Sequence, residues 1–172
     1  PRMGLYFPYG SPEAMDDDRF SDPEPGDLME RERDQHHWLV QALAVGTGEL
    51  VWTTEVNIGA PQFDRHLQNT FASSTPVTAG ERVSAYFGNV GVFALDMSGA
   101  ILWEQRFDPA TTRLGWGPAA SPVLHGDSLF IVNDNDEQSF VVALDAATGE
   151  EEWRVNRDED VSYTHLTVPT KA

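Results

Sequence analysis

The chain has 172 residues, of which 40% are hydrophobic and 10% are aromatic, and its formal net charge is −17. This length and composition predict one domain with enough apolar surface for a core. The charge excludes partners that present many phosphates, such as nucleic acid and an anionic membrane surface. Because cysteine is absent, disulfides, thiolate zinc sites and cysteine nucleophiles are also excluded.

Residues 1–35 are rich in proline, glycine and acidic residues, as in the run from Asp22 to Asp27. Such a segment cannot bury much apolar surface, so we expect a loop. No apolar run reaches the roughly 18 residues of a membrane-spanning helix, and no signal peptide is recognisable. Since the sequence starts at Pro1 and stops within a repeating pattern, we expect it to be an internal piece of a longer protein.

The middle of the chain, residues 36–160, has the pattern of strands joined by turns. Its apolar residues alternate or form short blocks bounded by Gly, Asp or Pro, and no helical period of useful length is present. Strands are expected over residues 38–44, 49–55, 73–78, 82–87, 91–96, 100–106, 120–124, 128–133, 140–145 and 150–155.

An internal repeat runs through this region. The segments Ala42–Trp52 and Ala143–Trp153 share the form A-L-x-x-x-T-G-E-x-x-W, and Ala94–Trp103 is the same unit with one residue fewer in the turn. The three tryptophans are spaced 51 and 50 residues apart. A fixed period of this length is typical of propellers and other repeat folds.

A second element repeats in phase with the first. Pro76 and Pro122 lie 46 residues apart, and each precedes a strand, a glycine-containing turn and another strand. Each period therefore holds four strands, the content of one propeller blade. We predict an all-β fold, a β-propeller fragment of four-stranded antiparallel blades, with a partial blade at 37–56 and blades at 70–107 and 117–156. These would be about two and a half blades of a ring of about seven or eight.

The repeated residues have predicted structural roles. An acidic side chain at the end of a strand can close the turn by hydrogen bonds to the backbone, and glycine supplies a positive φ. A large indole can pack against the neighbouring blade and donate a hydrogen bond from its N–H; a ligand platform is the alternative. These roles fall to Asp96, Asp145, Gly48, Gly149, Trp52, Trp103 and Trp153.

These units resemble the tryptophan-docking motif A-x-D-x-x-T-G-x-x-x-W of the pyrroloquinoline-quinone (PQQ) propeller family. Ala143–Trp153 matches every fixed position, Ala42–Trp52 has Ala44 in place of Asp, and Ala94–Trp103 is one residue shorter. The similarity covers about residues 36–160 and is typical of bacterial PQQ-binding-like repeat proteins. It implies a propeller fold and a periplasmic, cell-surface or secreted location.

The resemblance leaves two functions open. The family includes quinoprotein dehydrogenases that use PQQ and Ca²⁺, a scaffold lipoprotein for outer-membrane protein assembly, and proteins without an assigned function. The dehydrogenases commonly carry a disulfide of adjacent cysteines over the quinone, which this chain cannot form, and no residue can be matched to a PQQ contact. We therefore expect a non-catalytic binding or scaffold module for a protein, peptide or glycan. The alternative is a PQQ- and Ca²⁺-dependent alcohol or sugar dehydrogenase whose cofactor site lies in other blades.

Two pairs of loop residues are candidates for binding a ligand or partner. Arg113 and Trp116 lie on a glycine-flanked loop and can recognise a carboxylate or a sugar face; a packed connector is the alternative. His66 and Asn69 precede the first strand of a blade, where side chains could face the central channel. The alternative for His66 is a loop histidine bonded to the backbone.

A metal site is a further candidate. Asp134, Asp136 and Glu137 cluster carboxylate oxygens of the kind that Ca²⁺ prefers. Their spacing lacks the glycine and the final glutamate of an EF-hand loop. The alternative is a polar hairpin between the strands expected at 128–133 and 140–145.

The last twelve residues, 161–172, resemble the conceptual translation of a sequencing transposon adapter. Lys171 is the only lysine in the chain, against ten arginines. Against this, Pro169 follows Pro122 by 47 residues, close to where the next blade would place a proline. We interpret 161–172 as a non-native tail and leave it out of the functional reasoning.

Overall fold

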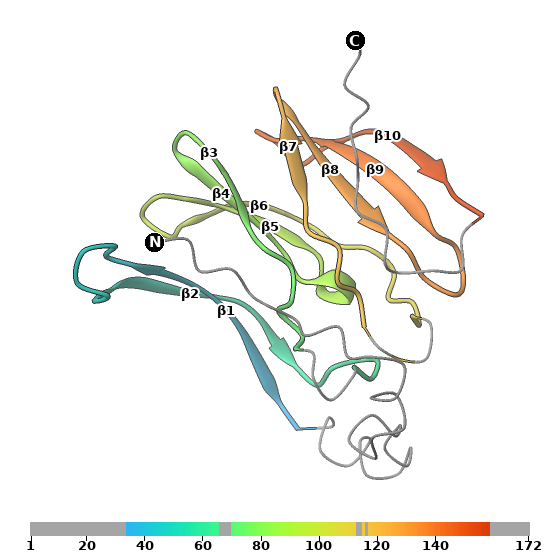
Figure 1. The fold of residues 1–172 in the computed structure, drawn as a ribbon, viewed down its shortest axis with the longest axis horizontal. Coiled ribbons are helices and arrows are strands. Elements are labelled where there is room, and N and C mark those ends of the chain that lie inside the picture. Colours follow the sequence, from blue (N-terminus) through green and yellow to red (C-terminus); the bar gives the residue numbers. More distant parts are fainter. Residues whose placement is uncertain (1–33, 66–69, 113–114, 116, 159–172) are drawn as a thin grey trace, which may run out of the picture.

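The computed structural model describes residues 34–65, 70–112, 115 and 117–158. These residues form three antiparallel sheets that follow one another in chain order (Figure 1). The all-β fold of four-stranded antiparallel sheets expected from the sequence is confirmed, as part of a β-propeller. The number of blades in a closed ring stays a prediction.

The first sheet has two strands and the other two sheets have four each, in the described part of the chain. The first pairs β1 (His36–Leu43) with β2 (Leu50–Gly59). The second has the order β3 (Val77–Ala79), β4 (Arg82–Tyr86), β5 (Val92–Asp96) and β6 (Ile101–Gln105), with a 3₁₀ turn, η3 (Gly88–Val90), between β4 and β5. The third has the order β7 (Val123–His125), β8 (Ser128–Asn133), β9 (Phe140–Asp145) and β10 (Glu151–Asn156).

Two strands begin later than the sequence predicts. The expected ranges 73–78 and 120–124 overlap β3 and β7 only at their ends. Pro76 and Pro122 stand just before these strands, and proline has no N–H for the ladder. The observed inner strands are therefore only three residues long.

The residues before these prolines connect the two blades instead. Ser74 donates its hydroxyl hydrogen to the carbonyl oxygen of Ala120 at 2.7 Å, and the Thr75 N–H donates to the Ser121 hydroxyl at 2.9 Å. The contact occurs at the same position of both repeats, 46 residues apart. It therefore fixes the start of each blade against its neighbour.

The core consists of two clusters, one on each face of the second sheet. Strand β5 is buried on both faces because successive side chains of a strand point to opposite sides. Phe93 and Leu95 pack toward the first sheet, whereas Val92 and Ala94 pack toward the third, and all four are fully buried. This explains why β5 reads as a continuous apolar run rather than an alternating one.

Trp103, on β6, joins the second sheet to the third. Its indole N–H donates to the carbonyl oxygen of Ala146 at 3.2 Å, and the side chain is 9% exposed. The ring lies so close to Gly149 that an added Cβ there would be 2.5 Å from the ring. Arg82 reinforces the contact by donating to the same Ala146 oxygen at 2.8 Å.

Trp52, on β2, makes the same contact one blade earlier. Its indole N–H donates to the carbonyl oxygen of Met97 at 2.9 Å, and its ring would lie 2.8 Å from a Cβ added to Gly99. Thr54 adds a hydrogen bond to the Gly99 oxygen at 2.6 Å. The first and second sheets thus each place a tryptophan on the turn of the next sheet.

The turn after β9 is closed by Asp145. Its Oδ1 accepts from the N–H groups of Thr148 and Ala147, both at 2.8 Å, and these bonds lower the pKa of the carboxyl. Asp96 closes the turn after β5 in the same way, where the Ser98 hydroxyl and backbone hydrogen bonds lower its pKa.

We expect these two turns to weaken in acid. Because the folded pKa of each carboxyl lies below its usual value of 3.8, the stabilisation is present above that value and is lost as the pH falls through the folded pKa. Between about pH 5 and 3, the urea midpoint of the double variant Asp96→Asn/Asp145→Asn should therefore fall less than the urea midpoint of the wild type. Glu81→Gln, on an exposed turn, controls for removal of a charge. If the urea midpoints of the double variant and of Glu81→Gln fell equally over this pH range, the role given to Asp96 and Asp145 would be contradicted.

Candidate functional site

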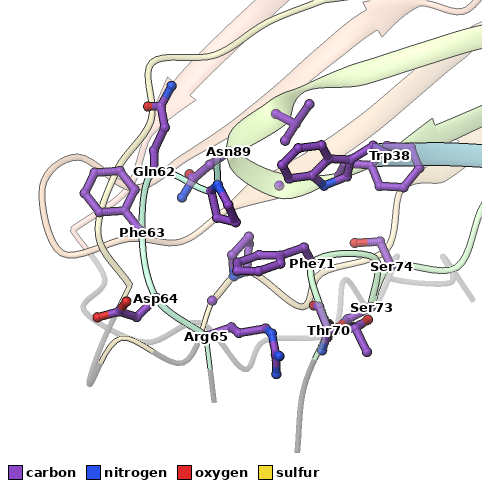
Figure 2. A pocket seen from close by; sticks show the side chains of 16 residues that line it. Trp38, Gln62, Phe63, Asp64, Arg65, Thr70, Phe71, Ser73, Ser74 and Asn89 are labelled. Atoms are coloured by element: carbon purple, nitrogen blue, oxygen red, sulfur yellow. Dashed lines mark hydrogen bonds between the residues drawn. The ribbon is translucent and has the colours of Figure 1, made fainter. Parts of the chain in front are cut away.

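A hollow surface lies beside β1, where the first and second sheets meet. A recess of about 40 Å³ and a shallower one of about 360 Å³ adjoin there. Both are lined by Trp38, Arg65, Thr70, Phe71 and Phe87, which we call the Phe71 groove. Figure 2 shows Phe71 at its centre, between Trp38 and Arg65.

Aromatic contacts build the walls of the groove. Strand β1 alternates its burial, so Trp38 and Val40 point into the core while their neighbours point outward. The Phe71 ring packs edge-on against His36 at a centroid distance of 5.4 Å and lies 6.3 Å from the Trp38 ring. These contacts leave a half-buried phenyl face on the surface of the blade.

Trp38 carries a polar group without a partner. The side chain is 5% exposed, and its Nε1 has no hydrogen-bond acceptor in the described part of the chain. A buried N–H without an acceptor costs about 1–3 kcal/mol. A ligand that brings an oxygen acceptor into the groove would remove this cost.

The positively charged guanidinium of Arg65 lies over the ring of Phe71. The guanidinium carbon of Arg65 lies 5.4 Å from the centre of the Phe71 ring, a cation–π distance. Asp64 lines the deeper recess beside it. The groove thus combines apolar walls, a buried donor and a guanidinium within a chain whose net charge is −17.

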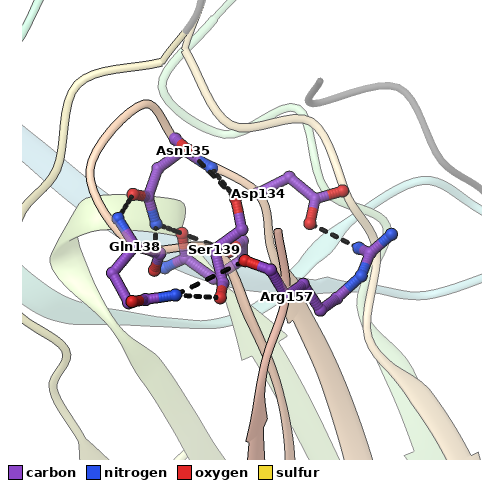
Figure 3. Close-up of polar contacts among 6 residues, drawn as sticks. Asp134, Asn135, Gln138, Ser139 and Arg157 are labelled. Carbon is purple, nitrogen blue, oxygen red and sulfur yellow. Dashed lines mark hydrogen bonds and ion pairs between the residues drawn. The ribbon is translucent and has the colours of Figure 1, made fainter. Parts of the chain in front are cut away.

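A second polar site is the loop between β8 and β9 (Figure 3). Asn135 organises it, because its Oδ1 accepts from the N–H groups of Glu137 at 2.9 Å and Gln138 at 2.7 Å. Ser139 closes the loop by accepting from the Asn135 N–H at 2.9 Å. This is the polar hairpin that the sequence left open as one interpretation of the acidic cluster.

The three carboxylates predicted to bind a metal have separate surroundings. Asp134 is buried and forms an ion pair with Arg157, and Glu137 accepts from the Thr111 N–H at 3.3 Å. The Asp136 side chain is exposed. No group of three His, Asp or Glu side chains in the described residues could hold a metal ion. The described residues therefore do not fit the Ca²⁺ of a PQQ site, and a metal at these three stays a prediction.

Tyr86, on β4, is buried and close enough to Asp134 of this loop to be affected by its charge. Its hydroxyl has no hydrogen-bond partner in the described part of the chain. Burial, and then the charge of Asp134, raises its pKa far above the usual value. Tyr86 therefore stays neutral, as a core residue with an unused donor.

The other predicted ligand residues, Arg113, Trp116, His66 and Asn69, lie outside the described residues. Of the predicted docking-motif residues, Trp52, Trp103 and Gly149 lie at the blade contacts given above, and Asp96 and Asp145 close the turns. Trp153 is 44% exposed, and a Cβ at Gly48 would meet nothing within 4 Å among the described residues. Sequence reasoning missed the Phe71 groove and Arg82. The one available signal for the groove was the aromatic run His36-His37-Trp38 at the start of a strand, with Phe71 following 33 residues after Trp38.

The sheets and the repeated tryptophan contacts define a PQQ-like β-propeller repeat protein. The sequence profile of the family described as "Outer membrane protein assembly factor BamB" matches residues 36–172, and the chain belongs to this family. The match includes residues 161–172, whose non-native origin stays a prediction. No curated protein matches the chain significantly.

The chain is similar to several solved structures. The chain is similar to a europium-containing methanol dehydrogenase at 19% identity and a TM-score of 0.50, over 71% of this chain and 22% of that one. It is also similar to BamB from Moraxella catarrhalis, at 22% identity and a TM-score of 0.48, over 67% and 30% of the two chains. A quinohemoprotein alcohol dehydrogenase from Comamonas testosteroni gives 20% identity and a TM-score of 0.49, over 69% and 18%. The chain thus spans less than a third of each of these proteins.

No helix in the described residues is long and apolar enough to cross a membrane.

Proposed function

We propose that this chain is part of an exported, non-catalytic β-propeller that binds a partner protein through the Phe71 groove. The observation that carries the proposal is the Trp38 side chain, which lines the surface hollow and whose buried N–H has no acceptor in the described part of the chain. The family description, an outer membrane protein assembly factor, supports a protein partner and an exported location.

The chemistry of the groove favours an extended peptide. A backbone carbonyl of the peptide would accept the Trp38 N–H, and an apolar or aromatic side chain would pack on Phe71 and Phe87. A neighbouring carboxylate would pair with the Arg65 guanidinium. A carboxylate is also disfavoured elsewhere on so acidic a chain, which gives the groove selectivity.

Indole resonances in a ¹H–¹⁵N spectrum test this proposal. On titration with the acetylated peptide Gly-Phe-Glu-Gly-amide, we expect the Trp38 Nε1–H signal to move downfield and saturate, because it gains an acceptor. Phe71→Ala should weaken binding by about tenfold, the usual cost of a contact worth about 1.4 kcal/mol. Phe130→Ala, a partly buried phenylalanine on β8, is the matched control and should bind like the wild type.

Two results would contradict the proposal. One is a Trp38 signal that does not move at millimolar peptide while the other indole signals stay dispersed, which shows that the protein is folded. The other is a saturable response to glucose or maltose but none to the peptide, which would make the ligand a glycan. A Ca²⁺-dependent response to PQQ would point instead to the quinoprotein alternative.

A further inference from the structure

Three exposed apolar side chains gather where β5 turns into β6. Ile101 and Leu102, the first two residues of β6, are 43% and 49% exposed, and Met97, on the turn that leads into β6, is 57% exposed. We call these three residues the β6 rim. The second sheet lies between the first and the third, and each of its faces belongs to a packed core (Figure 1). The exposure of the β6 rim therefore does not come from a sheet face that lacks a neighbour.

The third sheet shows that these positions need not be apolar. Its outer strand has Glu151 and Glu152 there, and it pairs with β9 in the same register, β-bulge included, as β6 pairs with β5. Charged side chains keep a sheet edge in water and discourage a further strand from pairing with it. Because the same four-stranded sheet forms with two glutamates, the apolar side chains of the β6 rim are not required by the fold.

The outer edge of β6 is open to pairing. This strand is last in the order of its sheet, and within the described part of the chain it pairs only with β5. An exposed edge presents unpaired N–H and C=O groups, which form a template for a further strand, and extended peptides bind to such edges by strand addition. Apolar side chains of an added strand would lie against Ile101 and Leu102 and cover them.

Charge favours a basic strand at this edge. Glu104, further along β6, lies 3.4 Å from Arg106, and both side chains are nearly half exposed. A surface pair of this kind contributes little, so Glu104 can pair with a second cation on an added strand. The net charge of −17 repels an acidic strand, and it equally disfavours a second copy of this chain as the occupant.

We propose that the β6 rim binds an extended segment of a partner protein in which apolar residues alternate with lysine or arginine, added to the second sheet beside β6. This surface is separate from the Phe71 groove. Ile101 stands at the start of β6, whereas Phe87 of the groove lies beyond the opposite end, where Gln105 pairs with Val92. The groove favours a carboxylate and the β6 rim a basic strand, so the two surfaces take different segments.

A ¹H–¹⁵N titration of the 172-residue protein with the acetylated peptide Gly-Lys-Val-Lys-Ile-Lys-Val-Gly-amide tests the proposal. We expect saturable shifts of the backbone amide signals of residues 101–105, because N–H groups at the edge gain acceptors. The control peptide has proline in place of the isoleucine, which keeps the charge but interrupts pairing along a strand. It should bind at least about tenfold more weakly.

The double variant Ile101→Thr/Leu102→Thr tests the same contact from the protein side. Threonine keeps the charge and the strand propensity while most of the apolar contact is lost. The isoleucine peptide should bind this variant about tenfold more weakly, and the binding of the Gly-Phe-Glu-Gly peptide to the Phe71 groove should not change. Val155→Thr, which removes a side chain 56% exposed on β10, is the matched control and should bind like the wild type.

Several outcomes would overturn the proposal. Equal binding of the two basic peptides would reduce the effect to attraction by the acidic chain, and a double variant that binds like the wild type would remove the β6 rim from the contact. Amide shifts confined to residues outside 101–105, or no shifts at millimolar peptide, would also contradict it. Shifts of residues 101–105 that grow with protein concentration in the absence of peptide would make the occupant a second copy. The proline peptide is tested on the wild type, so its result does not depend on the folding of a variant.

Discussion

Replacing Trp103 with alanine is expected to lower the free energy of unfolding by about 3–5 kcal/mol, the usual cost of deleting a buried tryptophan side chain. The indole fills the space between the second and third sheets and donates to Ala146. The substitution removes this hydrogen bond and leaves a cavity above Gly149. Because each blade is stabilised mainly by its neighbour, the two sheets should also lose cooperativity.

Urea unfolding followed by circular dichroism measures this effect. Trp153→Ala is the matched control, since it removes the same side chain from the same position of a blade, where the described residues place no neighbouring blade on it. It should cost about 1 kcal/mol or less. Equal losses in the two variants would show that the docking contact contributes nothing beyond the contacts within a sheet.

Asp134→Ala is expected to cost about 2–4 kcal/mol. The Asp134 side chain is 2% exposed and its ion-pair partner Arg157 is 22% exposed, so the substitution leaves a largely buried guanidinium without its counter-charge. Removing one partner of a buried pair typically costs about 3–5 kcal/mol, and the partial exposure of Arg157 reduces this value. The loop between β8 and β9 should loosen as a consequence.

Thermal unfolding compares this variant with Glu151→Ala. Glu151 pairs with Arg154 at 2.7 Å, but both side chains are more than one third exposed, so its loss should cost less than about 1 kcal/mol. A similar shift in the two variants would contradict the structural role given to Asp134. The same experiment tests the predicted metal, because a Ca²⁺-dependent rise in the melting temperature of the wild type that Asp134→Ala abolishes would support it.

Much of the fold was predictable because the same residue types recur at the same positions of each blade. The regular spacing of Trp52, Trp103 and Trp153 fixes the period, and the prolines at 76 and 122 mark where each blade starts. The periodicity could not show that proline would shorten the inner strands. The residues before it use their polar atoms between blades instead of within a sheet.

The site was not predictable from the same pattern. The Phe71 groove brings together β1, the segment ending at Arg65, the residues around Phe71, and Phe87 just before η3, which are separated in sequence and are not part of the repeated motif. Arg82 was missed for a related reason, since the equivalent position of the next blade is Ser128. Features that occur once arise from tertiary packing, and a periodic analysis cannot detect them.

Titration calorimetry on the full-length protein tests the central claim, a propeller that binds a protein segment and carries out no PQQ chemistry. One arm uses the Gly-Phe-Glu-Gly peptide, and the other uses PQQ with and without Ca²⁺. The account predicts saturable heat from the peptide that Phe71→Ala reduces, and no heat from PQQ in either condition. Saturable, Ca²⁺-dependent PQQ binding together with no response to the peptide would contradict it and would identify a quinoprotein oxidoreductase.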